Sequence, residues 1–427
     1  MTGTQAVGKG KSEFPRLRKD IDLMPMRGED GKTLIVVRDP LELDSRGPAA
    51  LSTGALPLLS LLDGAHSPEQ IRLHLVEQTA RAGQLTAIPL EVVESLILGL
   101  DEAYLLDNGR YRDARTRLVE NFIALTDRPP ALAGKSYPAE KSELQQFIAG
   151  LLGSAGENPK WAELKDKPVL ALVTPHIELS VGEKIYSAGY GLLNGRSYDR
   201  VVVLGVGHSM ERGLFSLTAK DYRTPLGRVP TEQLAVSRLK KAAGPLALED
   251  DFAHRSEHSI EFQVLFLQSV LEGPFTLVPV LCGSLYGDLI LGDKKRPREI
   301  KELLPALDYL SELLADSSKK TLLLAGVDFS HVGPKFGDRK PAIQITSGSS
   351  SHDLTLLRHL AGRDVEAFCA EGKGVLDRYH VCGFSVLSLL LEVLPPEAKG
   401  VELGHRVWHE APTQSAVSFA AAAFYMD

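Results

Sequence analysis

An apolar run that stops abruptly at titratable residues is the feature that most restricts what this chain can fold into. Residues 321–326 are almost entirely apolar, and Asp328 and His331 follow directly after them. A run without polar alternation is typical of a strand that is covered on both faces, as in a mainly parallel sheet. We therefore predict a buried strand that carries Asp328 and His331 to the edge of such a sheet.

Two further runs have the same design. Residues 168–175 lead into His176 and residues 200–207 lead into His208, each through a Gly or a Pro. In open α/β sheets, ligands bind outside the carboxyl ends of the strands, where a switch in topology opens a crevice. A polar loop residue or a helix cap would explain any one of these histidines. Three equivalent strand ends favour one shared cleft that also contains Asp328.

The length of the chain predicts more than one domain. With 427 residues it exceeds what one hydrophobic core usually holds. Ten of the twelve histidines follow residue 170, which places the chemistry in the later part. We expect a first domain over residues 14–125, a linker with a lead-in helix over 126–165, and an α/β domain with a mixed, mainly parallel sheet over 166–427.

The pattern of the first domain predicts a small, winged-helix-like α+β unit. Two extended segments flank an EDGK turn at residues 29–32, which indicates a hairpin. Ser67 is a typical start signal of a helix, and an apolar helical pattern follows from Pro89. The Asn-Gly pair at Asn108 and Gly109 then predicts a closing hairpin, the wing.

Nucleic acid is not expected as a partner, although many winged helices bind DNA. The helix in the position of a recognition helix carries Glu91, Glu94, Asp101 and Glu102 and no Lys or Arg. Phosphate groups would be repelled by that face, and the formal net charge of the chain is -7. The first domain is therefore expected to bind a peptide or a protein.

Several other classes of protein are disfavoured. The N-terminal residues lack the apolar core of a secretory signal, and no run of 18 apolar residues occurs, so neither export nor a membrane is expected. Three scattered cysteines suit a reducing compartment, which predicts a cytoplasmic protein. Gly-rich phosphate loops and the GxSxG elbow are absent, so we expect no nucleotide cofactor and no serine hydrolase.

Two more motifs carry candidate residues. EHSIE places Glu257 and Glu261 four residues apart beside His258, so both carboxylates are expected on one helix face, with Ser256 able to cap. A solvated helix end is the alternative. Cys382 precedes a hydrophobic helix, and a thiol near a helix N-terminus has a lowered pKa that makes it a better ligand or nucleophile. Its alternative role is that of a small buried hydrophobic residue.

Taken in order, these motifs resemble the Memo family, the B component of the AmmeMemoRadiSam system, over about residues 168–427. The resemblance is carried by TPH at His176, LGVGH at His208, YRTPLG from Tyr222, EHSIE from Glu257, LVPVLCG from Leu277, VDFSHVG from Val327, CG at Cys382 and SAVSFAAAAF from Ser415. The first domain is similar to the PqqD type of peptide-binding domain, also called the RiPP recognition element, through FPRLRKDIDLMP and LDEAYLLDNGRYR.

The resemblance implies a fold similar to the class III extradiol dioxygenases, whose iron lies between two histidines and an acid. The metal positions of the family fall on His176, His208 and Cys382, and its neighbouring pocket positions fall on Asp328, His331 and His258. After His176 the chain reads IELSVG where many relatives have Ala-Gly-Tyr, so Glu178 is expected in the pocket wall with Glu257 and Glu261.

Two imidazoles and one thiolate leave open positions on a first-row metal, and soft sulfur favours iron or copper over magnesium. His331, oriented by Asp328, is the expected general acid or base, since a carboxylate fixes the tautomer of an imidazole. The short spacing of these two residues is equally compatible with a structural pair.

Two functions from different classes remain open at this point. The first is a metal-dependent, dioxygenase-like oxidoreductase that acts on a small molecule or on a peptide delivered by the first domain. The second is a non-catalytic metal- or ligand-binding adaptor of the AmmeMemoRadiSam system with a radical-SAM protein as its partner. The metal content of the purified protein separates them.

Overall fold

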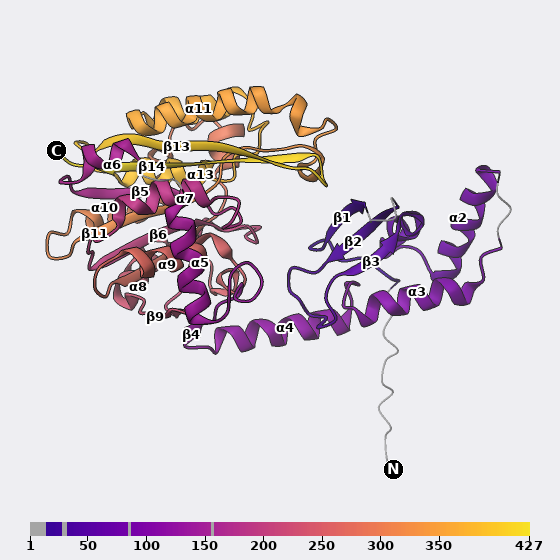
Figure 1. Cartoon of the computed structure of the whole chain (residues 1–427). Coiled ribbons are helices and arrows are strands. Elements are labelled where there is room, and N and C mark those ends of the chain that lie inside the picture. The colour runs from indigo at the N-terminus through magenta and orange to yellow at the C-terminus, as the bar shows by residue number, and fades with distance from the viewer. Residues whose placement is uncertain (1–13, 28–31, 84–86, 155–157) are drawn as a thin grey trace, which may run out of the picture. The chain divides into compact units, whose positions relative to one another are not determined.

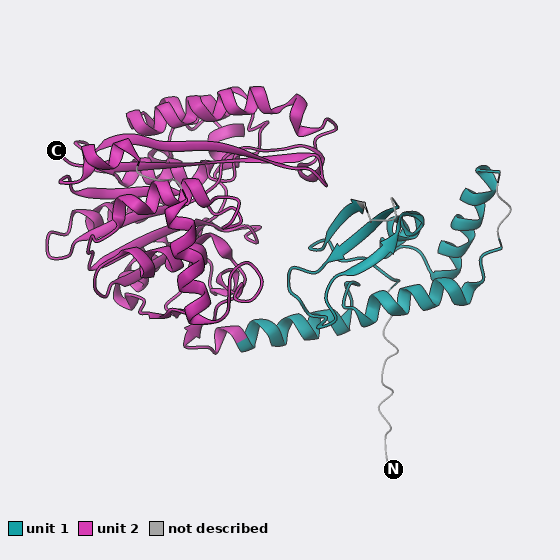
Figure 2. Ribbon diagram, in the orientation of Figure 1, with its two compact units in different colours: residues 1–121 teal, residues 122–427 magenta. Residues whose placement is uncertain are grey.

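The chain forms two compact units, Met1–Asn121 and Phe122–Asp427 (Figure 2). The computed structural model describes residues 14–427 except 28–31, 84–86 and 155–157 (Figure 1). Helix α4 (Gly109–Ile123) crosses the boundary, so a single helix leads the chain from the first unit into the second.

The first unit packs helices on a small antiparallel sheet. The sheet has the order β1-β2-β3, with β1 (Asp22–Arg27), β2 (Thr33–Arg38) and β3 (Ala49–Ser52). The helices are α1 (Leu56–Leu61), α2 (Pro68–Arg81) and α3 (Leu90–Glu102). Strands β1 and β2 pair antiparallel, as the hairpin prediction requires, although residues 29–31 of the EDGK turn lie outside the described residues. Ser67 caps α2 and forms a capping box with Gln70.

The predicted wing at Asn108 and Gly109 is wrong. Asn108 instead starts helix α4, because its side-chain oxygen accepts a hydrogen bond from the backbone N–H of Tyr111 at 3.1 Å. An asparagine that caps a helix and one that turns a hairpin have the same local sequence signal. Leu106, two residues before Asn108 in the expected hairpin, forms only an isolated bridge with Leu17.

The second unit is built on a mixed eight-stranded sheet, and the α/β prediction is confirmed at that level. Its path is β12-β14-β5-β11-β6-β10-β7, with β13 paired to β14. The four central strands β5, β11, β6 and β10 run parallel, and their neighbours β7 and β14 run antiparallel. The bounds are β5 (Val169–Thr174), β6 (Arg200–Val206), β7 (Phe215–Leu217), β10 (Thr276–Cys282), β11 (Thr321–Gly326), β12 (His331–Val332), β13 (Lys399–Glu410) and β14 (Ser415–Tyr425).

Helices cover both faces of this sheet (Figure 1). Val201 and Val203 of β6 join one core, together with α5 (Lys141–Gly153), α7 (Glu183–Tyr190) and α9 (His258–Val270). Val202 and Leu204 join the other core. Its helices are α8 (Gln233–Ala243), α10 (Leu304–Ala315), α11 (Thr346–Gly362), α12 (Val365–Gly374) and α13 (Phe384–Val393). Burial on both sides is the reason why these strands show no polar alternation.

The segment expected as a linker, residues 126–165, is largely built into the second unit. Strand β4 (Asp127–Arg128) pairs with β8 (Asp221–Thr224), which in turn pairs with β9 (Gly227–Val229). The lead-in helix is present as α5, and a short helix α6 (Pro159–Leu164) follows it. Among the described helices, none combines the length and the apolar character that crossing a membrane requires.

Candidate metal centre

Three parallel strands deliver the candidate residues to one edge of the sheet. His176 follows β5, His208 follows β6, and Asp328 follows β11. Helix α9 starts against the same edge because two glycines leave room for it. A Cβ atom on Gly205 would lie 2.5 Å from the Ser259 hydroxyl oxygen, and one on Gly326 would lie 2.4 Å from the carbonyl oxygen of Ser259.

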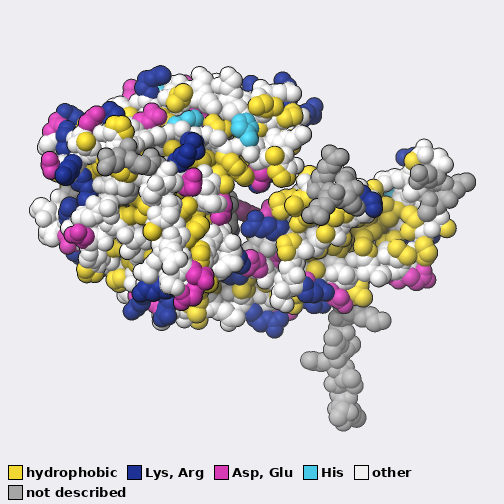
Figure 3. Space-filling view, viewed as in Figure 1, with side chains coloured by type: hydrophobic (Ala, Val, Ile, Leu, Met, Phe, Trp, Pro, Cys, Tyr) yellow, Lys and Arg dark blue, Asp and Glu magenta, His cyan; other side chains and the backbone are white. Residues whose placement is uncertain are grey.

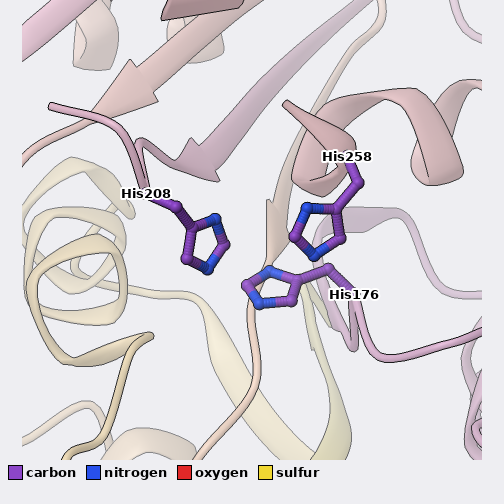
Figure 4. A group of neighbouring side chains, drawn as sticks. All are labelled: His176, His208 and His258. Atoms are coloured by element: carbon purple, nitrogen blue, oxygen red, sulfur yellow. The ribbon is translucent and has the colours of Figure 1, made fainter. Parts of the chain in front are cut away.

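This close packing brings His258, the first residue of α9, to the two strand-end histidines (Figure 4). One potential ligand atom from each of His176, His208 and His258 lies within 4.8 Å of the other two. The ring centroids are 4.9 to 5.0 Å apart, and the rings of His208 and His258 are stacked. The structure thus assembles a three-imidazole cluster, in which His258 joins the two histidines expected as metal ligands.

Each imidazole of the cluster has a protein acceptor at Nδ1. Nδ1 of His176 lies 3.0 Å from the carbonyl oxygen of Gly326. Nδ1 of His208 lies 3.0 Å from Oε1 of Glu257, and Nδ1 of His258 lies 3.1 Å from the same oxygen. Metal-binding histidines usually donate their second N–H in this way, which fixes the tautomer. Nε2 of each ring is left as the potential ligand atom.

Charge in the cluster is set by the buried Glu257. Burial alone would raise the pKa of this carboxyl, but His208 and His258 beside it hold the pKa well below its usual range. For His208, burial opposes protonation, and the Glu257 carboxylate outweighs it and raises the pKa. The pKa of His176 is lowered well below its usual value by its burial and by the two neighbouring imidazoles. His176 is therefore neutral near pH 7, as a metal ligand must be.

Cys382 lies beside the cluster. Its Sγ is 3.6 Å from Nε2 of His176 and 3.4 Å from the carbonyl oxygen of Asp328. The expectation of a lowered thiol pKa is wrong, because burial and the nearby Asp328 carboxyl raise the pKa well above its usual value. Proximity to the start of α13 does not compensate for the loss of water. A bound cation would reverse this, since a coordinating thiol is deprotonated.

The Asp328 carboxylate binds the His176 loop and does not orient His331. Its Oδ1 accepts hydrogen bonds from the backbone N–H groups of His176 at 3.0 Å and Ile177 at 3.3 Å. Burial raises the pKa of Asp328 to about 7. Nδ1 of His331 lies 2.9 Å from the carbonyl oxygen of Phe329, so the predicted Asp328–His331 pair is wrong. Burial lowers the pKa of His331 to about 4, and its imidazole is neutral near pH 7.

The three candidate pocket carboxylates lie in different environments in the structure. Glu257 is the N-cap of α9, where its extended backbone turns the carboxylate toward the histidines, and it takes the role expected of Ser256. Glu261 lies inside the helix, is fully buried and pairs with Arg128, so its assignment to the pocket is wrong. The same-face argument fails because an N-cap residue does not have helical geometry. Glu178 is exposed.

Comparison with known proteins identifies relatives of both units. A family model described as Memo-like protein matches residues 128–423. A MEMO1 family protein of Aquifex aeolicus is 31% identical over 392 residues, 91% of this chain and 96% of the relative. A MEMO1 family protein of Thermus thermophilus is 30% identical over 331 residues, 77% of this chain and 92% of the relative. The first match is longer than the second unit and therefore extends into the first.

One solved structure shows a weak likeness to this chain. It is the crystal structure of uncharacterized protein JW3007 from Escherichia coli K12, with 14% sequence identity, a TM-score of 0.35, and coverage of 60% of this chain and 99% of that one.

Proposed function

This chain belongs to the family of Memo-like proteins, and on that premise we propose that it is a metal-dependent, dioxygenase-like oxidoreductase. Iron or copper is the proposed metal, and a small molecule or a peptide is the proposed substrate. The observation that carries the proposal is the cluster of His176, His208 and His258, in which every Nδ1 is held by a protein acceptor and the three rings converge.

The residues present fit a first-row transition metal. Imidazole nitrogen and thiolate sulfur are donors that iron and copper accept, whereas magnesium and calcium prefer oxygen. His176, His208 and His258 would hold the metal, with Cys382 as a further ligand. Such a metal would supply redox chemistry that the imidazole and carboxylate groups at this edge of the sheet lack.

The remaining residues supply access and proton handling. The side chains of His208 and His258 are 40% and 34% exposed, so a substrate can approach the cluster from their side. Asp328, with a pKa of about 7 and its Oδ2 3.6 Å from Nε2 of His176, can take up or release a proton at neutral pH. His331, whose pKa of about 4 leaves its imidazole neutral, can serve only as a general base at this pH and not as the acid.

The first unit is proposed to recruit a peptide or a protein, including a radical-SAM partner. Strands β1 and β3 are the edges of its sheet, and an extended peptide can add to such an edge. Met26 of β1 and Leu34 of β2 are cross-strand neighbours, and both side chains are exposed. Figure 3 shows further hydrophobic side chains on the surface of this unit. Exposed apolar side chains that adjoin one another in this way favour a contact surface for a partner.

Anaerobic purification followed by elemental analysis and oxygen-consumption assays tests the proposal. Stoichiometric iron or copper, lost together with oxygen consumption in His176→Ala and His208→Ala, is the expected result. A folded parent protein that takes up neither metal would overturn it and favour the adaptor function.

A further inference from the structure

Arg128 is a fully buried arginine in a segment that the sequence predicts as a linker. It is the last residue of β4, shortly after the end of α4, and the family match begins with it. A buried cation is costly unless its donors are all paired. Its partners therefore show what this arginine does.

Two of the three hydrogen-bonding nitrogens of Arg128 donate to the segment that enters α9, and the third donates to the helix itself. Nε donates to the carbonyl oxygen of His254 at 2.9 Å, and Nη2 donates to the carbonyl oxygen of Glu257 at 2.8 Å. Nη1 donates to the carboxylate of Glu261. A planar guanidinium holds its donors in a rigid fork with fixed directions, whereas the three donors of an ammonium group rotate on a flexible stem.

Glu257 connects this arginine to the three-imidazole cluster. Its carbonyl group is held by Arg128, while its carboxylate accepts from the backbone N–H of His208 and lies at Nδ1 of both His208 and His258. The backbone position of Glu257 decides where that carboxylate lies. Glu257 is thus the single residue that links Arg128 to the imidazoles of His208 and His258.

The ion pair with Glu261 secures the other side of the arrangement. The Glu261 carboxylate also accepts from the backbone N–H groups of Ala131 and Leu132, both at 3.0 Å, and from the hydroxyl of Tyr137. Buried ion pairs are often no more stabilising than apolar residues of similar volume. The two backbone carbonyl contacts of Arg128, however, are lost with any apolar replacement. The contacts of Arg128 therefore serve to place the backbone at these carbonyl groups more than to stabilise the fold.

We propose that Arg128 is a positioning residue of the metal centre. It holds the turn at Glu257 so that one carboxylate orients the imidazoles of His208 and His258. The inference rests on the proposed metal-binding function and extends it to a residue outside the cluster. It also makes the geometry of the cluster depend on the segment that follows α4, the helix that arrives from the first unit.

The double variant Arg128→Met/Glu261→Gln tests this in the full-length protein. It removes the cation without leaving a buried, unpaired carboxylate, and the glutamine oxygen remains an acceptor for Tyr137. The matched control is Arg200→Met/Glu232→Gln. Arg200 is also buried, lies 2.8 Å from Glu232 and donates to the carbonyl oxygen of Leu313 at 3.1 Å, but it stands at the start of β6, whose other end leads to His208.

Two readouts separate positioning from stability in variants whose fold is verified by circular dichroism. The first is the affinity for Co²⁺, measured by visible absorption. The second is the tautomer of His208 and His258 in the metal-free protein, read from the ring ¹⁵N shifts. We expect Co²⁺ affinity to fall about 10- to 100-fold in the Arg128 variant, the range typical for outer partners of metal ligands, and both tautomers to become mixed. The control keeps both properties.

Arg128→Lys adds a conservative variant. It retains the positive charge opposite Glu261 but lacks the planar guanidinium. Relative to the double variant, we therefore expect it to recover thermal stability and not Co²⁺ affinity. The inference would be overturned if the folded double variant kept the Co²⁺ affinity and the tautomers of the parent. It would also be overturned if Arg128→Lys recovered both thermal stability and Co²⁺ affinity. If the parent protein binds no Co²⁺, the proposed function fails instead, and the tautomers of the metal-free protein still test the role of Arg128.

Discussion

The carboxylate of Glu257 lies 3.0 Å from Nδ1 of His208, and the same oxygen lies 3.1 Å from Nδ1 of His258. One buried acid therefore orients two neighbouring imidazoles that come from different elements of the fold.

Replacing this acid weakens metal binding more than it weakens the fold. Glu257→Gln keeps a side-chain oxygen but removes the negative charge and one acceptor, so we expect metal affinity to fall about 10- to 100-fold. Titration with Co²⁺ measures this. Glu140→Gln is the matched control, because Glu140 caps α5 in the same unit and its side chain accepts from Ser142. Equal affinities in the two variants would contradict the role of Glu257.

Cysteine variants distinguish a ligand from packing residues. We expect Cys382→Ser to lose tight binding of iron or copper, because the thiolate is removed from a site 3.6 Å from Nε2 of His176. Cys282→Ser and Cys369→Ser each place a hydroxyl in apolar surroundings and should cost about 1 to 3 kcal/mol of stability with metal uptake unchanged. Elemental analysis of the folded variants decides, and equal metal content in all three would show that Cys382 is not a ligand.

His254 makes stability depend on pH. Burial lowers its pKa to about 4 from a usual value of 6.5, while Nδ1 faces the Tyr222 hydroxyl at 2.9 Å. The unfolded chain therefore binds a proton at a higher pH than the folded chain, so the free energy of unfolding falls as the pH drops from about 6.5 to about 4. The loss attributable to this residue is on the order of 3 kcal/mol. Denaturant unfolding of the metal-free protein should show a shallower pH slope for His254→Gln than for the parent, and parallel slopes would refute this.

Gly326 is required by the approach of α9 to β11. A Cβ atom there would lie 2.4 Å from the carbonyl oxygen of Ser259, so Gly326→Ala should cost about 1 to 3 kcal/mol and displace the start of α9 with His258. Gly150→Ala is the control, because nothing lies within 4 Å of its Cβ position in helix α5, and it should stabilise by about 0.5 to 1 kcal/mol. Thermal unfolding and Co²⁺ titration check both; a stable Gly326→Ala variant with full affinity would be inconsistent with this packing.

The second unit shows which structural features local sequence patterns can predict. Apolar runs that end in His176, His208 and Asp328 indicated buried strands whose ends meet. Burial on both faces and the end of the strand can both be recognised from residues that are adjacent in the sequence. Asn108 shows where such patterns fail: the same residue type caps a helix or turns a hairpin, and only the following helix α4 decides between them.

The sequence by itself determined the α/β pattern, the strand ends and the residue types gathered at them. Only the tertiary structure decided the partners of these residues: that Glu257 faces two histidines while Glu261 faces Arg128, and that a backbone carbonyl orients His331. Burial patterns repeat every few residues along the chain and can be recognised locally. Hydrogen-bond partners such as Arg128 and Glu257 are separated by more than a hundred residues, and their contact exists only once the two segments have packed.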